Sequence, residues 1–415
     1  MKNRIGIAMP VAAVWLAAAV WLAAAGTEAA NTVDNYAGSS YGSLLIAANW
    51  SLGSTPTVSR DAVFTGTSGI RSLTAGNLTV GSFNVTANTG TFSIRNNTSG
   101  ATDSILTLGG SGNLGNSVSG TAEDLLYVAG GSTFNLRGDN GNSPTPGTGV
   151  LKLVLGQSGN FNADGTMNIW AVLSDGGAGC SITKTGSGTL TFTNANTYSG
   201  GTLIYAGKLA LTGTGSIANS PTINVSAGAT CDVSGVTGFT LGAGQTLQGN
   251  GAVAGDIVMG SGSTLSPGNS TGTNCFYNAL TLSGNTNVFE LARTSDHDLT
   301  VVTSSGRLTL KEKPILVVQA DSLVANPDDT FTLFDNRSSA ALTLTDTFWL
   351  NANTPLPDNA SFTAGTKAFR INYGVGTDNN DIILTVIPEP GALPLLLFLG
   401  TALCLWQRLR QPKRR

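Results

Sequence analysis

The chain has 415 residues and a net charge of −3, and charged residues make up 11% of it, against about 25% in ordinary soluble domains. No basic stripe runs through the sequence, which argues against a nucleic-acid partner. Glycine is frequent, with 54 copies, whereas lysine and glutamate are scarce, so the composition predicts an all-β protein with helix only at its two ends.

Residues 1–29 are predicted to be a signal peptide. Lys2 and Arg4 precede an uncharged run from Ile5 to Ala25, and small residues follow. This three-part layout is typical of secretory signals, so we expect the chain to use the Sec export machinery. The apolar run is longer than in most such signals, which leaves an uncleaved membrane anchor as the alternative.

Residues 30–175 are predicted to form an N-terminal β-rich or solenoid region, with Trp50 and Phe64 packed inward. Its clearest break is the loop RGDNGNSPTPGTG at 137–149, which is rich in proline and glycine. The Arg-Gly-Asp tripeptide in that loop also occurs in integrin ligands, and we interpret it here as a chance match.

The stretch SITKTGSGTLTFTNANTYSGGTLIYAGKLALT, residues 181–212, alternates apolar residues with Thr, Lys or Ala. That period of two is typical of a strand with one buried face, and Gly or Asn stands at nearly every break. Apolar pairs recur along 209–282 at a spacing near that of one solenoid coil. We therefore predict a parallel, right-handed β-helix, with a β-sandwich as the alternative. The small aromatic share, 7%, suits a thin interior.

This stretch resembles an autotransporter-associated β-strand repeat. The residues that match the repeat pattern are Lys184, Gly186, Gly188, Leu190, Asn196, Thr197, Tyr198, Gly200, Gly201, Thr202, Gly207 and Leu209. The resemblance is convincing over about residues 180–390 and implies a passenger-like protein, here without the membrane-barrel domain of a true autotransporter. We place the repeat region at 176–287.

Residues 288–386 are predicted to be a C-terminal β-rich cap, because the apolar runs lengthen there, as in PILVV at 314–318. An open solenoid end requires such a cap, since unpaired strand edges invite aggregation.

The segment 387–415 combines three elements. Pro388-Glu389-Pro390 comes first, an uncharged apolar span follows at 392–406, and a basic tail occupies 408–415. The span is shorter than the roughly 20 residues that cross a bilayer comfortably, but a basic flank is expected to stay cytoplasmic and halt export. The stop-transfer residues are Arg408, Arg410, Lys413, Arg414 and Arg415.

This ending resembles the PEP-CTERM sorting signal of Gram-negative bacteria. The resemblance implies that an exosortase-type membrane transpeptidase removes the tail near Pro388, Glu389 and Pro390. It also implies a precursor held, transiently or permanently, in the inner membrane before delivery to the cell surface, the outer membrane or the extracellular matrix. A plain C-terminal membrane anchor is the alternative.

Few residues offer catalytic chemistry. The single histidine, His297, is interpreted as an exposed turn residue. The acid pairs Asp296/Asp298 and Asp328/Asp329 are the candidates for glycan cleavage, which needs converging carboxylates, and we interpret them as solvated turn residues. No metal, cofactor or catalytic site is predicted.

Two motif matches are also interpreted as chance. GSSYG (38–42) lacks the strand and helix that flank a nucleophile elbow, and GSGNLG (110–115) lacks the helix of a dinucleotide site. Cys180, Cys231 and Cys275 lie outside the apolar tail and allow one disulfide; the pairing stays open, with Cys231–Cys275 favoured over the alternatives that use Cys180.

The sequence thus predicts a non-enzymatic structural or adhesive protein at the cell surface, associated with extracellular polysaccharide through Thr, Ser and Asn side chains. The alternative is a polysaccharide lyase or glycosidase on a β-helix scaffold. Acids that converge in one groove would favour the enzyme.

Overall fold

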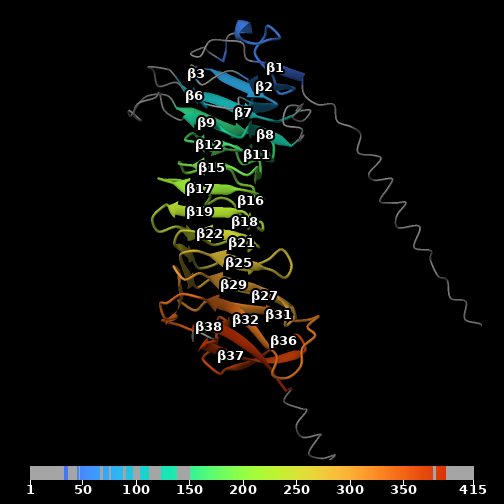
Figure 1. The fold of residues 1–415 in the computed structure, drawn as a ribbon, viewed down its shortest axis with the longest axis vertical. Coiled ribbons are helices and arrows are strands. Elements are labelled where there is room, and N and C mark those ends of the chain that lie inside the picture. The colour runs from blue at the N-terminus through green and yellow to red at the C-terminus, as the bar shows by residue number, and fades with distance from the viewer. Residues whose placement is uncertain are drawn as a thin grey trace, which may run out of the picture.

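The computed structural model describes residues 32–35, 44–45, 47–65, 69–73, 76–86, 90–96, 103–111, 123–137, 150–376 and 380–388. Within these ranges the chain is β-structure apart from one 3₁₀ turn, η1 (Ala47–Asn49). The strands stack as the rungs of a long ladder, from blue at the N-terminal end to red at the other (Figure 1). This confirms the all-β prediction.

The two terminal helices that were predicted at 1–29 and 392–406 lie outside the described residues. Among the residues that are described, we find no helix with the length and apolarity that crossing a bilayer requires.

Two long sheets build the ladder. In the described part of the chain, sheet 1 has 15 strands, in the spatial order β1 (Thr32–Asn35), β2 (Arg60–Phe64), β5 (Ser82–Val85), β8 (Asp124–Val128), β11 (Gly159–Ala163), β14 (Ile182–Thr185), β16 (Thr202–Ile204), β18 (Thr222–Val225), β21 (Thr246–Gly249), β24 (Thr264–Pro267), β27 (Thr286–Arg293), β31 (Ile315–Gln319), β34 (Phe348–Asn351) and β35 (Thr354–Leu356), with β28 (Asp296–His297) beside β27. Sheet 2 has 14, in the order β3 (Gly69–Ser72), β6 (Gly90–Arg95), β9 (Ser132–Arg137), β12 (Thr166–Ile169), β15 (Thr189–Phe192), β17 (Lys208–Thr212), β19 (Thr230–Gly235), β22 (Ala252–Ala254), β25 (Thr273–Phe276), β29 (Leu299–Val302), β32 (Thr330–Asn336), β38 (Asp381–Ile387), β37 (Lys367–Val375) and β36 (Ser361–Ala364).

Two short sheets form a third side. Sheet 3 contains β4 (Asn77–Val80), β7 (Ser104–Leu108), β10 (Leu151–Leu155) and β13 (Val172–Ser174). Sheet 4 contains β20 (Thr240–Leu241), β23 (Ile257–Met259), β26 (Ala279–Ser283), β30 (Arg307–Lys311) and β33 (Thr343–Leu344). From β2 to β34, apart from β28, consecutive strands of the chain enter different sheets, and each sheet pairs strands of successive coils. This is the arrangement that a β-solenoid requires.

Parallel register aligns the inward side chains of successive coils into columns. Met167 pairs with Leu190, and Leu190 with Leu209, and all three side chains are buried. Because side chains alternate across a strand, the residues between them face outward in columns of their own. The predicted alternation with one buried face is confirmed at Leu190 and Leu209.

Aromatic rings occupy more of the interior than the composition suggested. Phe64 stacks on Phe83 with ring centroids 4.4 Å apart, and Phe83 lies 5.5 Å from Phe134 in the next coil. Trp50 meets Phe64 edge-on, which confirms that both residues pack inward. The rings therefore contact one another both along the ladder axis and across the core between sheets 1 and 2.

The third side is interrupted between sheets 3 and 4. The coils β14–β15 and β16–β17, described throughout, contribute no strand there, and a single parallel bridge links Ala195 to Ser216. These two coils are therefore held by two sheets and by hydrogen bonds between turns.

Antiparallel strands close the C-terminal end. β38 pairs with β32 and β37, and β36 completes the edge of sheet 2. Sheets 1 and 2 continue across residues 176 and 288, and the predicted region boundaries there stay predictions.

Candidate functional site

Lys184, the first residue of the repeat pattern, is buried in an inward column of sheet 1. Its register neighbours are Phe161 in the preceding coil and Ile204 in the next, and its side chain is 1% exposed. Burial lowers the pKa of Lys184 to about 8, although the nearby Asp164 carboxylate raises it.

The ammonium group of Lys184 serves the corners of two coils. Nζ donates to the carbonyl oxygens of Thr185 and Gly186 at 2.6 and 2.8 Å, and to that of Ala206 in the next coil at 3.1 Å. These carbonyls belong to the turns that lead from sheet 1 into sheet 2. One cation therefore satisfies three carbonyl oxygens where the backbone bends away from strand pairing.

The Asn-Thr pair of the repeat replaces a missing strand on the third side. Asn196 Oδ1 accepts the Leu173 N–H at 3.0 Å, and the Thr197 N–H donates to the Leu173 carbonyl at 2.8 Å. The side chain of Asn196 thus occupies the place of a strand carbonyl beside β13. An amide side chain can act this way because it carries the same acceptor group as the backbone.

A hydroxyl chain ties Tyr198 to the neighbouring coil. The Tyr198 and Thr202 hydroxyls lie 2.6 Å apart, Thr202 donates to Ser220 at 2.8 Å, and Ser220 donates to the Gly200 carbonyl at 2.9 Å. Burial raises the pKa of Tyr198 far above its usual value, so the phenol stays neutral.

Glycine is required at some repeat positions and not at others. Gly186 has a φ of 75°, in the left-handed region, and a side chain on Gly200 would clash with the Cys180 carbonyl. A Cβ placed on the neighbouring Gly201 would lie 3.5 Å from its nearest atom, which is an ordinary contact. The other two repeat glycines, Gly188 and Gly207, lie at the sheet 1 to sheet 2 turns of their coils.

Asp175 supports the same region and was not singled out by sequence. Its Oδ2 accepts the Cys180 N–H at 2.9 Å and the Ser199 N–H at 3.0 Å, and its Oδ1 accepts the Gly177 N–H at 2.8 Å. Burial raises the pKa of Asp175, but these hydrogen bonds outweigh it and lower the pKa to about 2. The Asp-Gly-Gly sequence, typical of a turn, is the signal that could have found it.

Gln245 lies at the other end of the interrupted third side, shortly after β20. Its Nε2 donates to the carbonyls of Ile217 and Ser220 at 3.1 and 3.0 Å, and its Oε1 accepts the Gly242 N–H. A cavity of about 280 Å³ lies here, lined in part by Phe239.

The outer faces of both long sheets carry threonine columns. On sheet 1, Thr222, Thr246, Thr264 and Thr286 are register partners in four successive coils. On sheet 2, the same holds for Thr91, Thr133, Thr166 and Thr189. Successive rungs of a sheet are about 4.8 Å apart, so each column presents hydroxyls at that repeat.

Amide side chains reinforce the sheet 1 column. Asn224 and Gln248 both donate to Asn269 Oδ1, at 3.1 and 3.2 Å. The resulting face is uncharged, polar and partly exposed.

Three acidic side chains converge on one cavity near the C-terminal third. Glu290, Asp296 and Asp321 line a pocket of about 340 Å³, and Asp296 accepts a hydrogen bond from Thr271. Within the described ranges, no group of three or more Asp, Glu, His or Cys side chains is placed to hold a metal ion.

Asp298 does not face that pocket, and its interpretation as a solvated turn residue is wrong. Its side chain is fully buried, and its two oxygens accept the N–H groups of Gly272 and Glu290, both at 2.8 Å. Burial raises the pKa of Asp298 to about 7. Because both oxygens are engaged inside the coil, this carboxyl cannot reach a substrate.

The remaining chemical candidates do not join the acidic pocket. His297 lies in β28, half-buried and edge-on to Phe331 with ring centroids 5.3 Å apart, so the exposed-turn interpretation is wrong. Burial lowers the pKa of His297, which favours a neutral ring. Asp328 is exposed, and Asp329 accepts the Asn326 N–H within its own turn.

The predicted Cys231–Cys275 disulfide is wrong. All three described cysteines are free. Cys231 lies in β19 and Cys275 in β25, and β22 runs between them, so their strands are about 10 Å apart. Cys231 pairs with Val253 but Cys275 with Ala252, so the two side chains point to opposite faces and cannot be bridged.

Of the predicted sorting motif, Pro388 lies within the described residues. Pro388 directly follows β38 and is exposed. Glu389, Pro390 and the basic residues of 408–415 lie outside the described residues, as do Ser40 and the Gly-Asp part of the 137–139 tripeptide.

The stacked parallel coils define a class, that of β-solenoid proteins. The family model for the Passenger-associated-transport-repeat matches residues 182–216, the two coils at the interruption. The Adhesin BmaC autotransporter of Brucella suis biovar 1 (strain 1330) is 37% identical over 107 residues, which are 25% of this chain and 3% of that protein. The chain therefore carries a repeat of the autotransporter passenger type.

Proposed function

We propose that the protein is an exported, non-enzymatic adhesive or structural protein of the cell surface. The observation that carries this proposal is the passenger-type repeat within a long ladder whose outer faces are columns of hydroxyls and amides. The similarity to an adhesin supports the adhesive role.

The partner we propose is extracellular polysaccharide. Sugar hydroxyls both donate and accept hydrogen bonds, and so do threonine hydroxyls and the amide groups of Asn224 and Gln248. Each such bond contributes little in water, about 1 kcal/mol, but a ladder repeats it at every rung. The affinity then comes from many simultaneous weak contacts along a rigid scaffold.

The route to the surface that we propose is sorting by an exosortase-type transpeptidase. The proposal is supported by the exposure of Pro388, the first residue of the motif, directly after the last strand. Cells carrying Pro388→Ala with Glu389→Ala are expected to retain full-length protein in the inner membrane. Cell fractionation and mass spectrometry of the mature C-terminus check this, and unchanged maturation would favour a plain anchor.

Co-sedimentation tests the adhesive function itself. Full-length protein, purified in a mild detergent, is mixed with the extracellular polysaccharide of the producing cells. We expect the protein to pellet with the polysaccharide. We also expect the chain length of the polysaccharide to stay unchanged. Protein that stays in the supernatant would refute polysaccharide association.

The acidic pocket supports a second candidate, a glycan-active enzyme. Glu290 and Asp296 line the same cavity, as a carboxylate pair for glycoside cleavage would. Release of reducing sugar that is lost in Glu290→Gln and Asp296→Asn would establish the enzyme. We rank it second because Asp298, which among the described carboxyls has a strongly raised pKa, is sealed from the pocket.

A further inference from the structure

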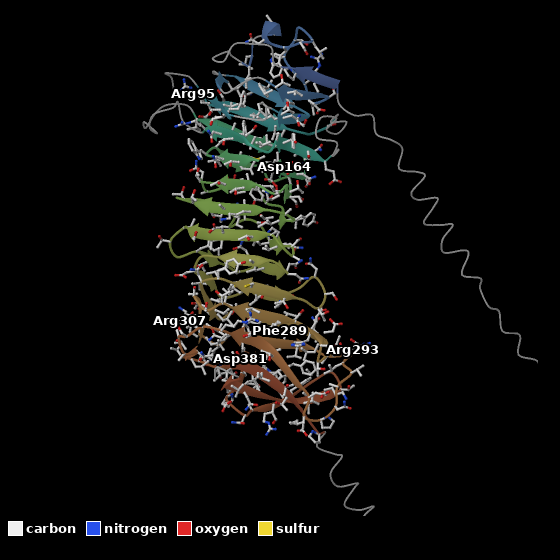
Figure 2. The ribbon with its side chains drawn as sticks, viewed as in Figure 1. Arg95, Asp164, Phe289, Arg293, Arg307 and Asp381 are labelled. Atoms are coloured by element: carbon white, nitrogen blue, oxygen red, sulfur yellow. The ribbon has the colours of Figure 1, made fainter. Side chains whose placement is uncertain are left out.

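A third column runs along the outer face of sheet 2. Arg95 at the end of β6 and Arg137 at the end of β9 are register partners. Trp170 directly follows β12 and donates its N–H to the Leu136 carbonyl at 2.8 Å, so it lies beside Arg137 in the next coil. We call Arg95, Arg137 and Trp170 the arginine strip. Figure 2 shows Arg95 at the flank of the ladder near its N-terminal end.

The strip places two guanidinium groups on neighbouring rungs. Trp170 holds one of them, since the Arg137 Cζ lies 4.6 Å from the centre of its ring. Arg95 forms no ion pair with a described residue, and its buried Nε has no hydrogen-bond partner among them. Two guanidinium groups on neighbouring rungs attract an anion together, because each is positively charged and can donate several hydrogen bonds.

Two polar columns run parallel to the strip. Asn168 donates to Asn135 Oδ1 at 2.8 Å, and Asn135 donates to Ser93 Oγ at 3.3 Å, which fixes an amide column next to the arginines. The threonine column of sheet 2 lies on the far side of this amide column, two residues earlier in each strand. In three successive coils the outward positions are therefore a threonine, then an asparagine or the buried Ser93, then an arginine or Trp170.

We propose that this face binds an acidic polysaccharide whose chain runs along the ladder axis, with sugar carboxylates on the arginine strip. A guanidinium binds a carboxylate through two parallel hydrogen bonds, and the rung spacing of about 4.8 Å is close to the length of one sugar unit. The amide and threonine columns then contact the hydroxyls of the same sugars. This inference rests on the proposed polysaccharide association and specifies its ligand and its surface.

The test compares polygalacturonate with its fully methyl-esterified form, which has the same backbone without the charge. Full-length protein is titrated with both by isothermal calorimetry at two salt concentrations. We expect wild-type protein to bind polygalacturonate at least tenfold more tightly than the ester, with affinity that falls as salt rises. Arg95→Gln and Arg137→Gln are each expected to weaken polygalacturonate binding about tenfold, the effect of losing one charged hydrogen-bonding group.

Lys152→Gln is the matched control. Lys152 lies in β10, in the same coil as Arg137 but on the third side, where it pairs with Asp103 at 2.6 Å. The Lys152→Gln substitution removes one positive charge, as the arginine substitutions do, and we expect it to leave polygalacturonate binding unchanged. Arg95→Lys keeps the charge and loses the planar fork, so it should retain salt-dependent binding at intermediate affinity. Equal melting temperatures show that the variants are folded.

Equal affinity for polygalacturonate and its ester, or arginine variants that bind like Lys152→Gln, would overturn the inference. If a variant that carries both Arg95→Gln and Arg137→Gln still pellets with the polysaccharide of the producing cells, the proposed surface is wrong and the proposed function stands. If wild-type protein binds neither that polysaccharide nor polygalacturonate, the proposed function fails as well.

Discussion

Replacement of Lys184 by methionine tests whether the repeat lysine stabilises the ladder through its buried charge. The change removes the ammonium group and leaves an unbranched apolar side chain that is one atom shorter. Three carbonyl oxygens, those of Thr185, Gly186 and Ala206, then lose their donor. A hydrogen bond to a charged group contributes about 1.5–3 kcal/mol, so the gross loss is about 4.5–9 kcal/mol.

Removal of the ammonium group also removes the cost of burying it. The pKa of Lys184 falls from 10.5 to about 8 on folding, and each unit corresponds to about 1.4 kcal/mol, which puts that cost near 3 kcal/mol. The net expectation is that Lys184→Met lowers the free energy of unfolding by about 1–6 kcal/mol at neutral pH.

The same residue predicts a pH dependence. Between about pH 8 and 10.5 the folded chain has released the Lys184 proton while the unfolded chain still holds it. The wild-type free energy of unfolding should therefore rise with pH across this window through this residue, and the rise should be absent in Lys184→Met.

Urea denaturation followed by circular dichroism measures these free energies, and hydrogen exchange of peptides from 182–216 locates the loss. Lys208→Met is the control, because it removes an exposed lysine. The ammonium group of Lys208 forms an ion pair at 3.1 Å with Asp232 in the following coil. A Lys184→Met protein as stable as Lys208→Met, with the same pH profile, would refute the reasoning.

Three further changes test the packing and the buried acid. Leu190→Lys should unfold the repeat coils, because an unpaired charge at a fully buried position costs several kcal/mol, and protease resistance equal to the parent would contradict this. Gly200→Ala should lower the free energy of unfolding by about 1–3 kcal/mol, whereas Gly201→Ala should change it by less than about 1 kcal/mol; equal effects in denaturation would show that the close approach at Gly200 is unimportant. Asp298 keeps its proton up to about pH 7 when folded but releases it near pH 3.8 when unfolded, so wild-type melting temperature should fall as pH rises between these values, and Asp298→Asn should lose that dependence.

The strands of the ladder could be predicted because alternation depends on local sequence. In TLTF of β15, Leu190 and Phe192 are buried and the threonines face outward, as a period of two requires. The same alternation also placed Lys184 inward, but lysine is almost never fully buried without partners. The partners of Lys184 are backbone carbonyls in two turns, and no pattern of side chains in the sequence predicts such partners.

Contacts between coils could not be predicted because the coils differ in length. Thr222 pairs with Thr246, and Thr246 with Thr264, so no fixed spacing gives the partner of a residue. The threonine columns and the Arg95–Arg137 pair depend on this register, and so does the error over Cys231 and Cys275. A shift of one position along a strand turns a side chain to the other face.

The interrupted third side gives the ladder a defined mechanical behaviour. A pull on its two ends loads the hydrogen bonds between successive coils in series, and the coils of residues 182–212 are joined by two sheets where their neighbours have three. Under tension we expect these coils to separate first, because side-chain and turn hydrogen bonds stand there in place of a third sheet.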